Sequence, residues 1–454
     1  PLVSSSAASD VYKRQVRKLD FCVFWHVFIV SQIDPSMMLP DRTVASATSI
    51  AVSGEEVRSE HAADHQMSID SAPLRVAVLG STGSIGKNTL EVIAASEGRF
   101  KVHLLCGHRS IDVLVEQAQA CRPRWVVVTD SAAAASLGSG ALPKGTELVV
   151  GPERLEELLT GPEIDRVVSA IVGAAGLRST WSALAAGKTV ALANKETLVT
   201  AGPLVTQLAA RSGATIVPVD SEHSAIHQAL RSGRRQELQR VVLTASGGPF
   251  RTHTKEQIAE VTPEQALKHP TWSMGPKITI DSATMMNKAL ELIEARWLFD
   301  LRADQLGVVV HPQSIIHSFV EFVDGSVIAQ IGPPDMKLPI QYALAYPERY
   351  DGPARRFDFG VAQQLELSPP DLERFPAVRL GYDVAARGGT AGVVLNAVNE
   401  EAVQAFLNGV VRFPQIAELC ERAVSEHPFI GDPTLEDILR LDAWARKEVK
   451  TWMC

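Results

Sequence analysis

Three acidic residues at two separate places in the chain have the chemistry needed to hold a divalent cation. Asp220 and Glu222 are two positions apart after a strand-like apolar run, so both side chains can point into one cleft, and Glu291 would complete the set. Three carboxylates leave coordination positions open for substrate oxygens on Mg²⁺ or Mn²⁺, with Co²⁺ as a further candidate. An Asp-x-Glu pair alone is also common in solvated turns, and roles on a helix face or in the core suit the nearby His223 and His227 better than ligation.

The segment that carries Glu291, residues 278–294, also contains the polar residues of a candidate phosphate seat. The β-branched run from Ile278 to Ile280 predicts a short strand, and Asp281 follows it as a good helix N-cap. A helix N-terminus favours anions through its free N–H groups and its dipole. The alternative is a capped amphipathic helix that carries only a surface Lys-Glu pair. In the phosphate-binding interpretation, the side chains of Ser282, Asn287 and Lys288 contact the phosphate beside the helix N-terminus.

A dinucleotide fingerprint stands near the start of the folded part of the chain. Leu74–Leu79 predicts a buried strand, Gly80-Ser-Thr-Gly-Ser-Ile-Gly86 follows it, and a helix is expected from about Asn88. This Gly-x-x-Gly-x-x-Gly variant lies between strand and helix, where a pyrophosphate can sit on the helix N-terminus. The next strand ends in Gly107-His108-Arg109 without an acidic residue, which favours NADPH because a guanidinium and an imidazole can bind a 2′-phosphate. A basic surface turn is the alternative.

Short strands and Ala- and Leu-rich helices alternate between residues 74 and 219. This alternation predicts the α/β class, with a doubly wound parallel sheet of Rossmann type that binds ligands at the carboxyl ends of its strands. Strands are expected at 125–128, 147–150, 166–171 and 189–192. Directly after the strand at 189–192, Asn194 and Glu196 are expected to contact the nicotinamide, and Lys195 is expected to contact the substrate.

Two loops in the following part of the chain are suited to ligand contacts. Ser246-Gly247-Gly248 follows a predicted strand, and its glycines would let the backbone approach an anion closely. The loop at 266–276 holds two prolines, Trp272 and Met274, which favours a lid that closes over a ligand. A connection packed into the core is the alternative for that loop.

The 454-residue chain has the composition of an ordinary globular protein, with 46% hydrophobic and 21% charged residues. A net charge of −8 argues against a nucleic acid or an anionic membrane as partner, so an anionic substrate would need a local basic site. The five cysteines are scattered without a metal-binding spacing, which indicates reduced intracellular thiols.

The first 66 residues do not resemble part of a fold. Their basic residues precede an apolar run, Phe21 to Val30, that is shorter than the ~20 residues a membrane helix needs, and no cleavage site of a signal peptide follows directly. We expect read-through upstream of a true start at Met67, with a plastid transit peptide as the alternative. A mature N-terminus well before Met67, found by mass spectrometry, would contradict this expectation.

The expected organisation has three folded parts after the leader. The last of them is a small helical bundle, predicted from four amphipathic helical segments that follow a Pro- and Arg-rich linker. The expected bounds are 1–72 for the leader, 73–220 for the NADPH-binding domain, 221–345 for the α+β catalytic domain, 346–372 for the linker and 373–448 for the bundle.

From about residue 74 to residue 446 the chain closely resembles the 1-deoxy-D-xylulose 5-phosphate reductoisomerase family of non-mevalonate isoprenoid biosynthesis. The order and number of shared motifs carry the resemblance. They are Gly80–Gly86, Ala193–Glu196, Val219–His223, Ser246–Phe250, His269–Met274, Asp281–Lys288, His311–His317, Pro334–Ile340 and Leu395–Glu400.

The resemblance implies a metal- and NADPH-dependent rearrangement of 1-deoxy-D-xylulose 5-phosphate followed by hydride transfer, giving 2-C-methyl-D-erythritol 4-phosphate. It implies a homodimer in which the strand-like segments 314–322 and 325–331 form an intersubunit sheet, and a cytoplasmic bacterial location. The matching catalytic and metal positions are Asp220, Glu222, Glu291, Lys195 and His269, of which the three acids hold the metal. The matching substrate positions are Lys195, Ser221, Glu222, Ser246, His269, Ser282, Asn287, Lys288 and Glu291. The matching cofactor positions are Thr82, Gly83, Ser84, Ile85, Gly107, His108, Arg109, Asn194, Glu196 and Gly275.

Two residues depart from the family pattern. His108-Arg109 replaces a Lys-Asn-like pair at the expected cofactor contacts, and Gly392 stands where a proline is common. Two other hypotheses compete with the reductoisomerase. One is a dehydrogenase similar to homoserine dehydrogenase, which would keep its activity in EDTA. The other is a catalytically silent NADPH sensor, which would have no need of three carboxylates and a phosphate seat.

Overall fold

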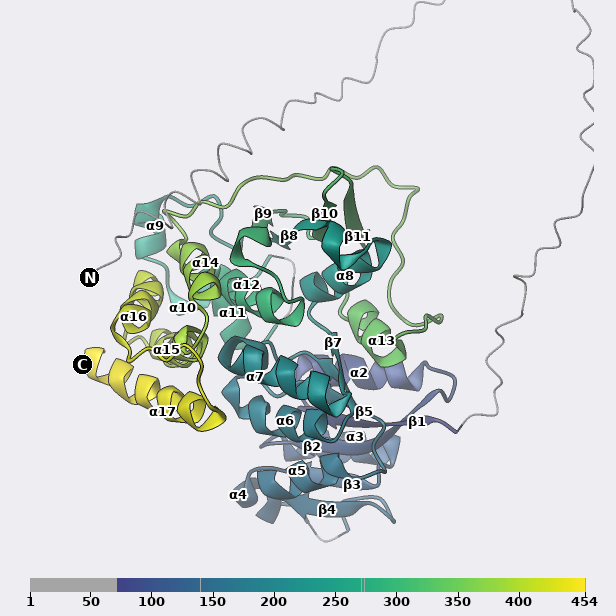
Figure 1. Ribbon diagram of the computed structural model, residues 1–454. Coiled ribbons are helices and arrows are strands. Elements are labelled where there is room, and N and C mark those ends of the chain that lie inside the picture. Colours follow the sequence, from purple (N-terminus) through teal and green to yellow (C-terminus); the bar gives the residue numbers. More distant parts are fainter. Residues whose placement is uncertain (1–71, 139, 271, 273, 454) are drawn as a thin grey trace, which may run out of the picture. The chain divides into compact units, whose positions relative to one another are not determined.

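The computed structural model describes residues 72–138, 140–270, 272 and 274–453 (Figure 1). The leader expected at 1–72 and the start expected at Met67 lie outside the described residues, apart from Ala72. Residues 73–454 group into one compact unit, to which the following paragraphs refer. Among the helices of the described residues, none has the length and hydrophobicity needed to cross a bilayer.

A seven-stranded sheet forms the lower part of the molecule in Figure 1, and every pair of neighbouring strands in it is parallel. The strand order, β4-β3-β2-β1-β5-β6-β7, reverses between β1 and β5, where α/β sheets open a ligand crevice. The expected doubly wound sheet is thereby confirmed. Its strands are β1 (Leu74–Leu79), β2 (Phe100–Gly107), β3 (Trp125–Val128), β4 (Glu147–Val150), β5 (Arg166–Ser169), β6 (Thr189–Leu192) and β7 (Thr215–Pro218).

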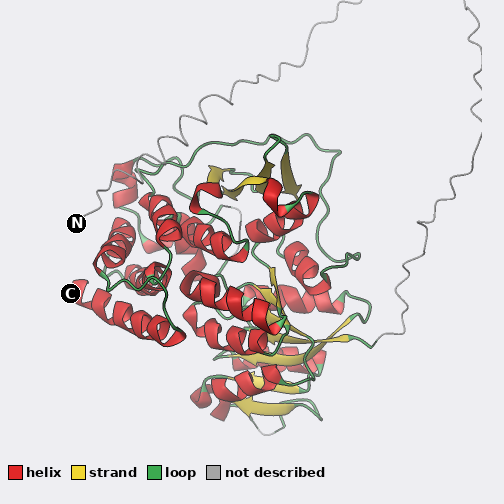
Figure 2. Ribbon diagram, in the orientation of Figure 1, coloured by secondary structure: helices red, strands yellow, loops and turns green. Residues whose placement is uncertain are grey.

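Helices cover both faces of this sheet, as continuous apolar strands require (Figure 2). In β1, Ala77 and Leu79 belong to one apolar cluster and Val76 and Val78 to another, because successive side chains point to opposite faces. The helices of this half are α2 (Ser84–Ala94), α3 (Ile111–Cys121), α4 (Ser131–Ala135), α5 (Pro152–Thr160), α6 (Leu177–Ala185) and α7 (Glu196–Ser212).

A second sheet, of mixed direction, lies above the first in Figure 1 and has the order β11-β10-β8-β9. β10 runs antiparallel to both β8 and β11, whereas β8 and β9 are parallel. Helix α8 packs on β10 and β11, and α12 packs between α7 and α14. The elements are β8 (Leu238–Ala245), β9 (Leu306–Val310), β10 (Ile316–Phe322), β11 (Val327–Ile331), α8 (Ser221–Ala229), α9 (Lys255–Ala259), α10 (Pro263–Ala266), α11 (Pro276–Ala283), α12 (Met286–Leu298) and α13 (Lys337–Ala345).

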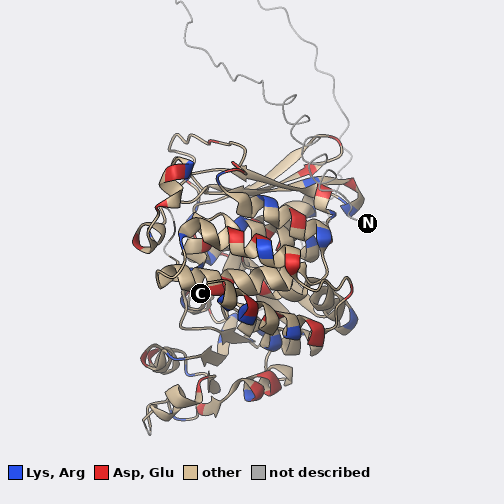
Figure 3. Cartoon of the chain, turned by 90° about the vertical axis from the view of Figure 1, so that its left-hand side faces the viewer, with Lys and Arg blue, Asp and Glu red and all other residues tan. Residues whose placement is uncertain are grey.

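Four C-terminal helices pack against one another and against α7 and α12 of the two preceding parts. The extended linker before them is pinned to β9 by the Val310–Ser368 bridge, and His311 Nδ1 lies 2.9 Å from the Glu366 carbonyl oxygen. On the face that includes these helices, acidic and basic residues are interspersed (Figure 3). The helices are α14 (Pro376–Arg387), α15 (Ala391–Leu407), α16 (Phe413–Glu426) and α17 (Leu435–Trp452).

Three local expectations were wrong, namely the strand at 278–280, the role of Asp281 as a helix N-cap and the helix start near Asn88. Ile278 to Ile280 is not a strand but the middle of α11, which begins with Pro276 at its first position after Gly275 as N-cap. Asp281 therefore lies in the last turn of α11, and the next helix begins after Met285, whose φ of +61° breaks the chain direction. Packing overrides the β preference of isolated Ile and Thr residues, and proline at a first helical position is compatible with a helix start. Helix α2 also begins at Ser84 rather than near Asn88.

Gly392 lets α15 approach the backbone of α7. A Cβ atom at this position would lie 2.1 Å from the Val199 carbonyl oxygen, which cannot move without disturbing α7. We predict that Gly392→Ala lowers the free energy of unfolding by about 1–3 kcal/mol, as overpacking usually does. Denaturant unfolding measures the effect. Gly138→Ala is the control, because a Cβ there meets nothing within 4 Å; equal stability of the two variants would contradict the prediction.

Candidate active site

The three acidic residues expected to hold a metal converge in the structure. Asp220 follows β7 and caps α8, Glu222 lies in the first turn of α8, and Glu291 lies in the second turn of α12. One carboxylate oxygen from each residue lies within 4.8 Å of one from each of the others. Three converging oxygen donors, with Glu291 fully buried, are the donor set that a hard divalent cation requires. The residues present therefore fit the metal that the sequence predicts.

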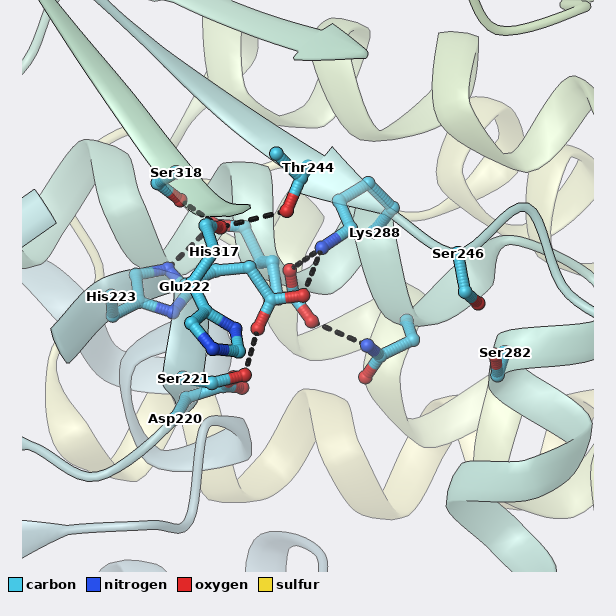
Figure 4. Close-up of polar contacts among 12 residues, drawn as sticks. Asp220, Ser221, Glu222, His223, Thr244, Ser246, Ser282, Lys288, His317 and Ser318 are labelled. Atoms are coloured by element: carbon cyan, nitrogen blue, oxygen red, sulfur yellow. Dashed lines mark hydrogen bonds and ion pairs between the residues drawn. The ribbon is translucent and has the colours of Figure 1, made fainter. Parts of the chain in front are cut away.

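Two lysines balance most of this negative charge. Lys195 Nζ lies 2.5 Å from Asp220 Oδ2 and 3.2 Å from Glu291 Oε1. Lys288 Nζ donates a 2.8 Å hydrogen bond to Glu222 Oε1 (Figure 4). It donates a second bond to Glu291 Oε2. A divalent cation would compete with both ammonium groups for the same oxygens. A bound metal would therefore replace lysine contacts at these oxygens, and the ammonium groups would be free to contact other anionic groups.

Burial shifts the pKa values in this cluster. Desolvation, followed by repulsion from Glu222, raises the pKa of Glu291 to about 7 despite its contacts with two lysines. Burial alone would lower the pKa of Lys195, but attraction to Asp220 and Glu291 outweighs it and holds that pKa well above its usual value. The pKa of Lys288 is also raised, against the effect of its burial, by the charges of Glu222 and Glu291. Both lysines are therefore charged at neutral pH.

A second group of polar side chains lies beside the carboxylates. His269 Nε2 is 3.0 Å from Ser282 Oγ and 3.3 Å from Ser246 Oγ. The glycine turn after β8 makes this possible, because Gly248, with φ +67°, lies so close to the Ser282 carbonyl that a Cβ would be 2.7 Å from it. In the view of Figure 4, Ser246 and Ser282 lie on one side of Lys288 and Asp220 on the other.

One cleft of about 490 Å³ joins these groups to the dinucleotide sheet. It is lined by the carboxylates, both lysines, Ser246, His269 and Ser282, and by Ser84, Ile85 and Asn88 of α2. Ser221, which donates a 2.6 Å hydrogen bond to Glu222 Oε2, and Asn287, which accepts one from Lys195 at 2.7 Å, also line it. The structure thus brings together every metal and substrate residue that the sequence predicted.

The turn between β1 and α2 has the geometry of a diphosphate site. Gly80 N and Ser81 N both donate to the Cys106 carbonyl oxygen, at 3.0 and 2.9 Å, which aligns the turn with β2. A Cβ on Gly86 would lie 2.4 Å from Ser81 Cα, so only glycine lets α2 pack this closely. Gly83 N donates a 3.1 Å hydrogen bond to the Gly80 carbonyl oxygen and closes the turn, and α2 begins at Ser84. A dinucleotide diphosphate fits at such a helix start.

The basic pair expected to bind the 2′-phosphate directly follows β2 and contacts residues that directly follow β3. His108 Nδ1 is 2.9 Å from Thr129 Oγ1, and Arg109 Nε donates a 2.7 Å hydrogen bond to Asp130 Oδ2. Asp130 also caps α4, and its hydrogen bond with Arg109 lowers its pKa to about 2. The carboxylate therefore holds the Arg109 guanidinium at the edge of the sheet, with 76% of the side chain exposed.

Asn194 has an internal role that the sequence did not indicate. Its side chain is buried, donates a 2.9 Å hydrogen bond to the Gly173 carbonyl oxygen and accepts one at 2.9 Å from Thr197 N. It therefore braces the loop after β5, residues 170–176, at the point where the strand order reverses. A direct contact of Asn194 with the cofactor stays a prediction.

Sequence reasoning assigned no role to several residues of this region. The loop after β5 touches the fingerprint turn, because a Cβ on Gly80 would lie 2.4 Å from the Ala170 carbonyl oxygen. The signal that could have identified it is the pair of glycines, Gly173 and Gly176, directly after a strand at the switch point. His317 lines the cleft as well, and the motif His311–His317 was the available signal.

His223 and His227 have the internal roles expected for them. His223 is fully buried, stacks on Phe299, and its Nδ1 lies 3.4 Å from Glu294 Oε2. Burial lowers its pKa to about 4. His227 Nδ1 lies 2.7 Å from the Tyr342 hydroxyl. His223 and Glu294 form with Asp220 a second group whose spacing could hold a metal.

The fold and the site define a nicotinamide-dependent oxidoreductase with a divalent-metal centre. Family models give the particular family: the model of 1-deoxy-D-xylulose 5-phosphate reductoisomerase matches residues 76–202, the model of its C-terminal domain matches 216–299, and a second C-terminal model, that of DXP reductoisomerase, matches 331–448. The chain belongs to the 1-deoxy-D-xylulose 5-phosphate reductoisomerase family, which confirms the resemblance found in the sequence.

Individual relatives agree with this assignment. The reductoisomerase of Rhodopirellula baltica is 49% identical over 428 residues, which is 83% of this chain and 94% of the relative. That of Heliobacterium modesticaldum is 50% identical over 375 residues, 82% of this chain and 96% of the relative.

Solved structures agree as well. The Zymomonas mobilis enzyme in complex with NADPH superposes with a TM-score of 0.78 at 43% identity, over 84% of this chain and 99% of that one. A DOX-P reductoisomerase in complex with NADPH, fosmidomycin and magnesium has a TM-score of 0.79 at 40% identity, over 84% of this chain and 98% of that one.

Metal binding should depend on pH because Glu291 must be ionised to act as a ligand. Its pKa is raised to about 7, so below that pH a proton occupies the ligand and metal must displace it. We predict that Mn²⁺ affinity falls about tenfold per unit as pH drops below 7 and levels off above it. Calorimetric titration between pH 6 and 8 measures this, with Glu291→Gln as the variant that loses the dependence. An affinity independent of pH in the wild type would refute the assignment.

Cofactor selectivity should depend on Arg109. A charge-assisted hydrogen bond to a phosphate is typically worth about 1.5–3 kcal/mol, so Arg109→Ala should weaken NADPH binding by about one to two decades. NADH, which lacks the 2′-phosphate, should bind the variant as it binds the wild type. Nucleotide fluorescence titration gives both constants, and Arg154→Ala, on the exposed surface of α5, is the control. Equal losses for the two nucleotides would show that Arg109 does not read the 2′-phosphate.

Proposed function

We propose that the cleft catalyses the two-step conversion of 1-deoxy-D-xylulose 5-phosphate to 2-C-methyl-D-erythritol 4-phosphate, through the residues described above. This proposal rests on one observation. Three carboxylates and the group formed by Ser246, His269 and Ser282 converge in one cleft, at the carboxyl edge of a dinucleotide-binding sheet. A rearrangement needs a polarised ketone, and a reduction in place needs hydride from the adjacent cofactor. Both requirements are met within the same cavity.

Asp220, Glu222 and Glu291 are proposed to hold the divalent cation. When bound there, the metal would act as a Lewis acid on the carbonyl and hydroxyl oxygens of the substrate. Lys195, already hydrogen-bonded to Asn287 and to two of the carboxylates, would orient those oxygens and keep a proton available beside them. The magnesium named in the related structure supports this choice of metal.

Ser246, His269 and Ser282 are proposed to bind the substrate phosphate, with Asn287 and Lys288 completing the seat from the first turn of α12. The hydroxyl and imidazole groups converge within hydrogen-bonding distance of one another, which is the spacing that the oxygens of a single phosphate can bridge. Lys288 lies between this group and the carboxylates, so it would shift toward the phosphate once a metal neutralises Glu222 and Glu291.

The cofactor is proposed to lie across the carboxyl edge of the sheet. Thr82, Gly83, Ser84 and Ile85 would hold its diphosphate, and Gly107, His108 and Arg109 its 2′-phosphate. Asn194, Glu196 and Gly275 would lie on the nicotinamide side. Trp272 and Met274 line the cleft, and as a lid their loop, 266–276, would exclude water during hydride transfer.

A homodimer is proposed from the β10–β11 hairpin. β11 is an edge strand of its sheet, and Val327 and Ile331 on it are 53% and 45% exposed. Exposed apolar edge strands pair readily with a second copy, so an intersubunit sheet would cover them.

The bacterial relatives support a cytoplasmic location. The domain division at 73–220, 221–345 and 373–448, with the linker at 346–372, is part of the same proposal.

The decisive experiment is NADPH oxidation with 1-deoxy-D-xylulose 5-phosphate, with and without Mg²⁺ or Mn²⁺. Wild type should turn over only with metal, and Glu222→Gln should lose at least about two decades of kcat because a neutral amide is a poor ligand for a hard cation. Glu421→Gln, on the exposed surface of α16, is the control for the same chemical change. Metal-independent turnover by pure wild type would favour a simple dehydrogenase, and no turnover with metal would refute the proposal.

A further inference from the structure

Lys277, to which the sequence gave no role, lies at the centre of a buried ionic group outside the metal cluster. It stands in the first turn of α11, where it pairs with Asp281 one turn further along the same helix. Its Nζ also lies 3.5 Å from Glu196 Oε1, at the start of α7. The carboxylate side chains of Asp281 and Glu196 are 2% and 9% exposed, so one ammonium group serves two carboxylates that water hardly reaches.

The ionic group continues on both sides through hydrogen bonds. On one side, Asn194 Nδ2 lies 3.2 Å from Glu196 Oε2, and Asn194 also braces the loop after β5. On the other side, Asn399 of α15 donates a 2.9 Å hydrogen bond to Asp281 Oδ1. A continuous polar path therefore runs from the cofactor edge of the sheet, through α11, to the C-terminal helices.

The position of α11 matters for the substrate because Ser282 follows Asp281 in its last turn. Any shift of this helix moves Ser282 relative to His269, with which it is in contact at 3.0 Å. The negative charge of Asp281 would also repel a phosphate at Ser282 unless a cation neutralises it. Lys277 supplies that cation from within the same helix.

We propose that Lys277 is a positioning residue that couples the cofactor side of the cleft, at Glu196, to the phosphate seat, at Ser282. This inference rests on the proposed function. A cofactor that contacts Glu196 changes the electrostatic attraction between that carboxylate and Lys277. Because a helix moves as a rigid element, this change affects the position of the whole of α11. By linkage, a phosphate-bearing ligand at Ser282 affects cofactor binding by the same factor.

The strength of this coupling follows from burial. Ionic contacts are screened little by solvent at such sites, and removal of one partner leaves the other charges uncompensated. Burial alone would lower the pKa of Lys277, but attraction to Asp281 and Glu196 outweighs it and raises that pKa, so the ammonium group is charged at neutral pH. Lys277→Met should therefore break the bridge while nearly preserving the volume of the side chain.

The test measures how much NADPH changes the affinity for fosmidomycin, the compound bound with magnesium in the related structure. Its dissociation constant is determined by calorimetry in Mg²⁺, with and without saturating NADPH. Couplings between two ligand sites are typically about 5–150-fold, and we expect a value in this range for the wild type. In Lys277→Met the factor should fall below about threefold, with Lys277→Arg retaining most of it.

Two controls separate positioning from general destabilisation. Lys255→Met makes the same chemical change at an exposed position at the start of α9 and should leave the coupling factor unchanged. If Lys277→Met does not fold, Asp281→Asn keeps the shape of the side chain and a hydrogen bond from Asn399, and it should lower the coupling factor in the same way. Thermal unfolding of each variant is recorded alongside.

The outcomes are distinguishable. A wild-type coupling factor near one, or an unchanged factor in folded Lys277→Met and Asp281→Asn, overturns this inference alone if the wild type still shows metal-dependent turnover. Loss of turnover in the wild type overturns the proposed function instead. A reduced factor in both variants with normal values in Lys255→Met supports the role of Lys277.

Discussion

The structure of the site depends on one constraint, which is that three carboxylates and two largely buried ammonium groups must remain together at one cleft. Asp220, Glu222 and Glu291 repel one another, and the burial of Glu291 makes that repulsion strong. Lys195 and Lys288 offset it by contacts with all three carboxylates. The cluster is thus held by mutual compensation, and any ligand that enters it must bring charge of its own.

This constraint explains why so many separate elements meet at one point. Lys195 comes from the end of β6, Asp220 from the end of β7, and Glu291 and Lys288 from α12. The parallel sheet presents its strand ends at one edge, and α12 packs against α7 and α14 beside that edge. Met285, which has a left-handed backbone conformation, separates α11 from α12. As a result, Ser282 faces His269 while Glu291 faces Asp220 and Glu222.

Lys277 extends the same principle away from the metal cluster. There too, a single ammonium group compensates two buried carboxylates that belong to different helices. Buried ionic contacts often contribute less to net stability than apolar packing of equal volume would. The apolar clusters therefore hold the molecule folded, whereas the contacts of Lys277 join α11 to α7 at the cleft.

The sequence by itself determined the fold class, because glycine spacing and strand periodicity are local properties. It also predicted metal and phosphate residues that the structure places in one cleft, although their roles as ligands stay predictions. It misassigned Ile278 to Ile280, since β-branched residues favour strands locally whereas packing and the proline at position 276 place them in a helix. It could not show that Asn194 braces the loop after β5 or that Lys277 bridges Glu196 and Asp281. Those roles depend on distances between elements far apart in the chain. Only tertiary packing sets these distances, because it decides which charged side chains are buried next to one another.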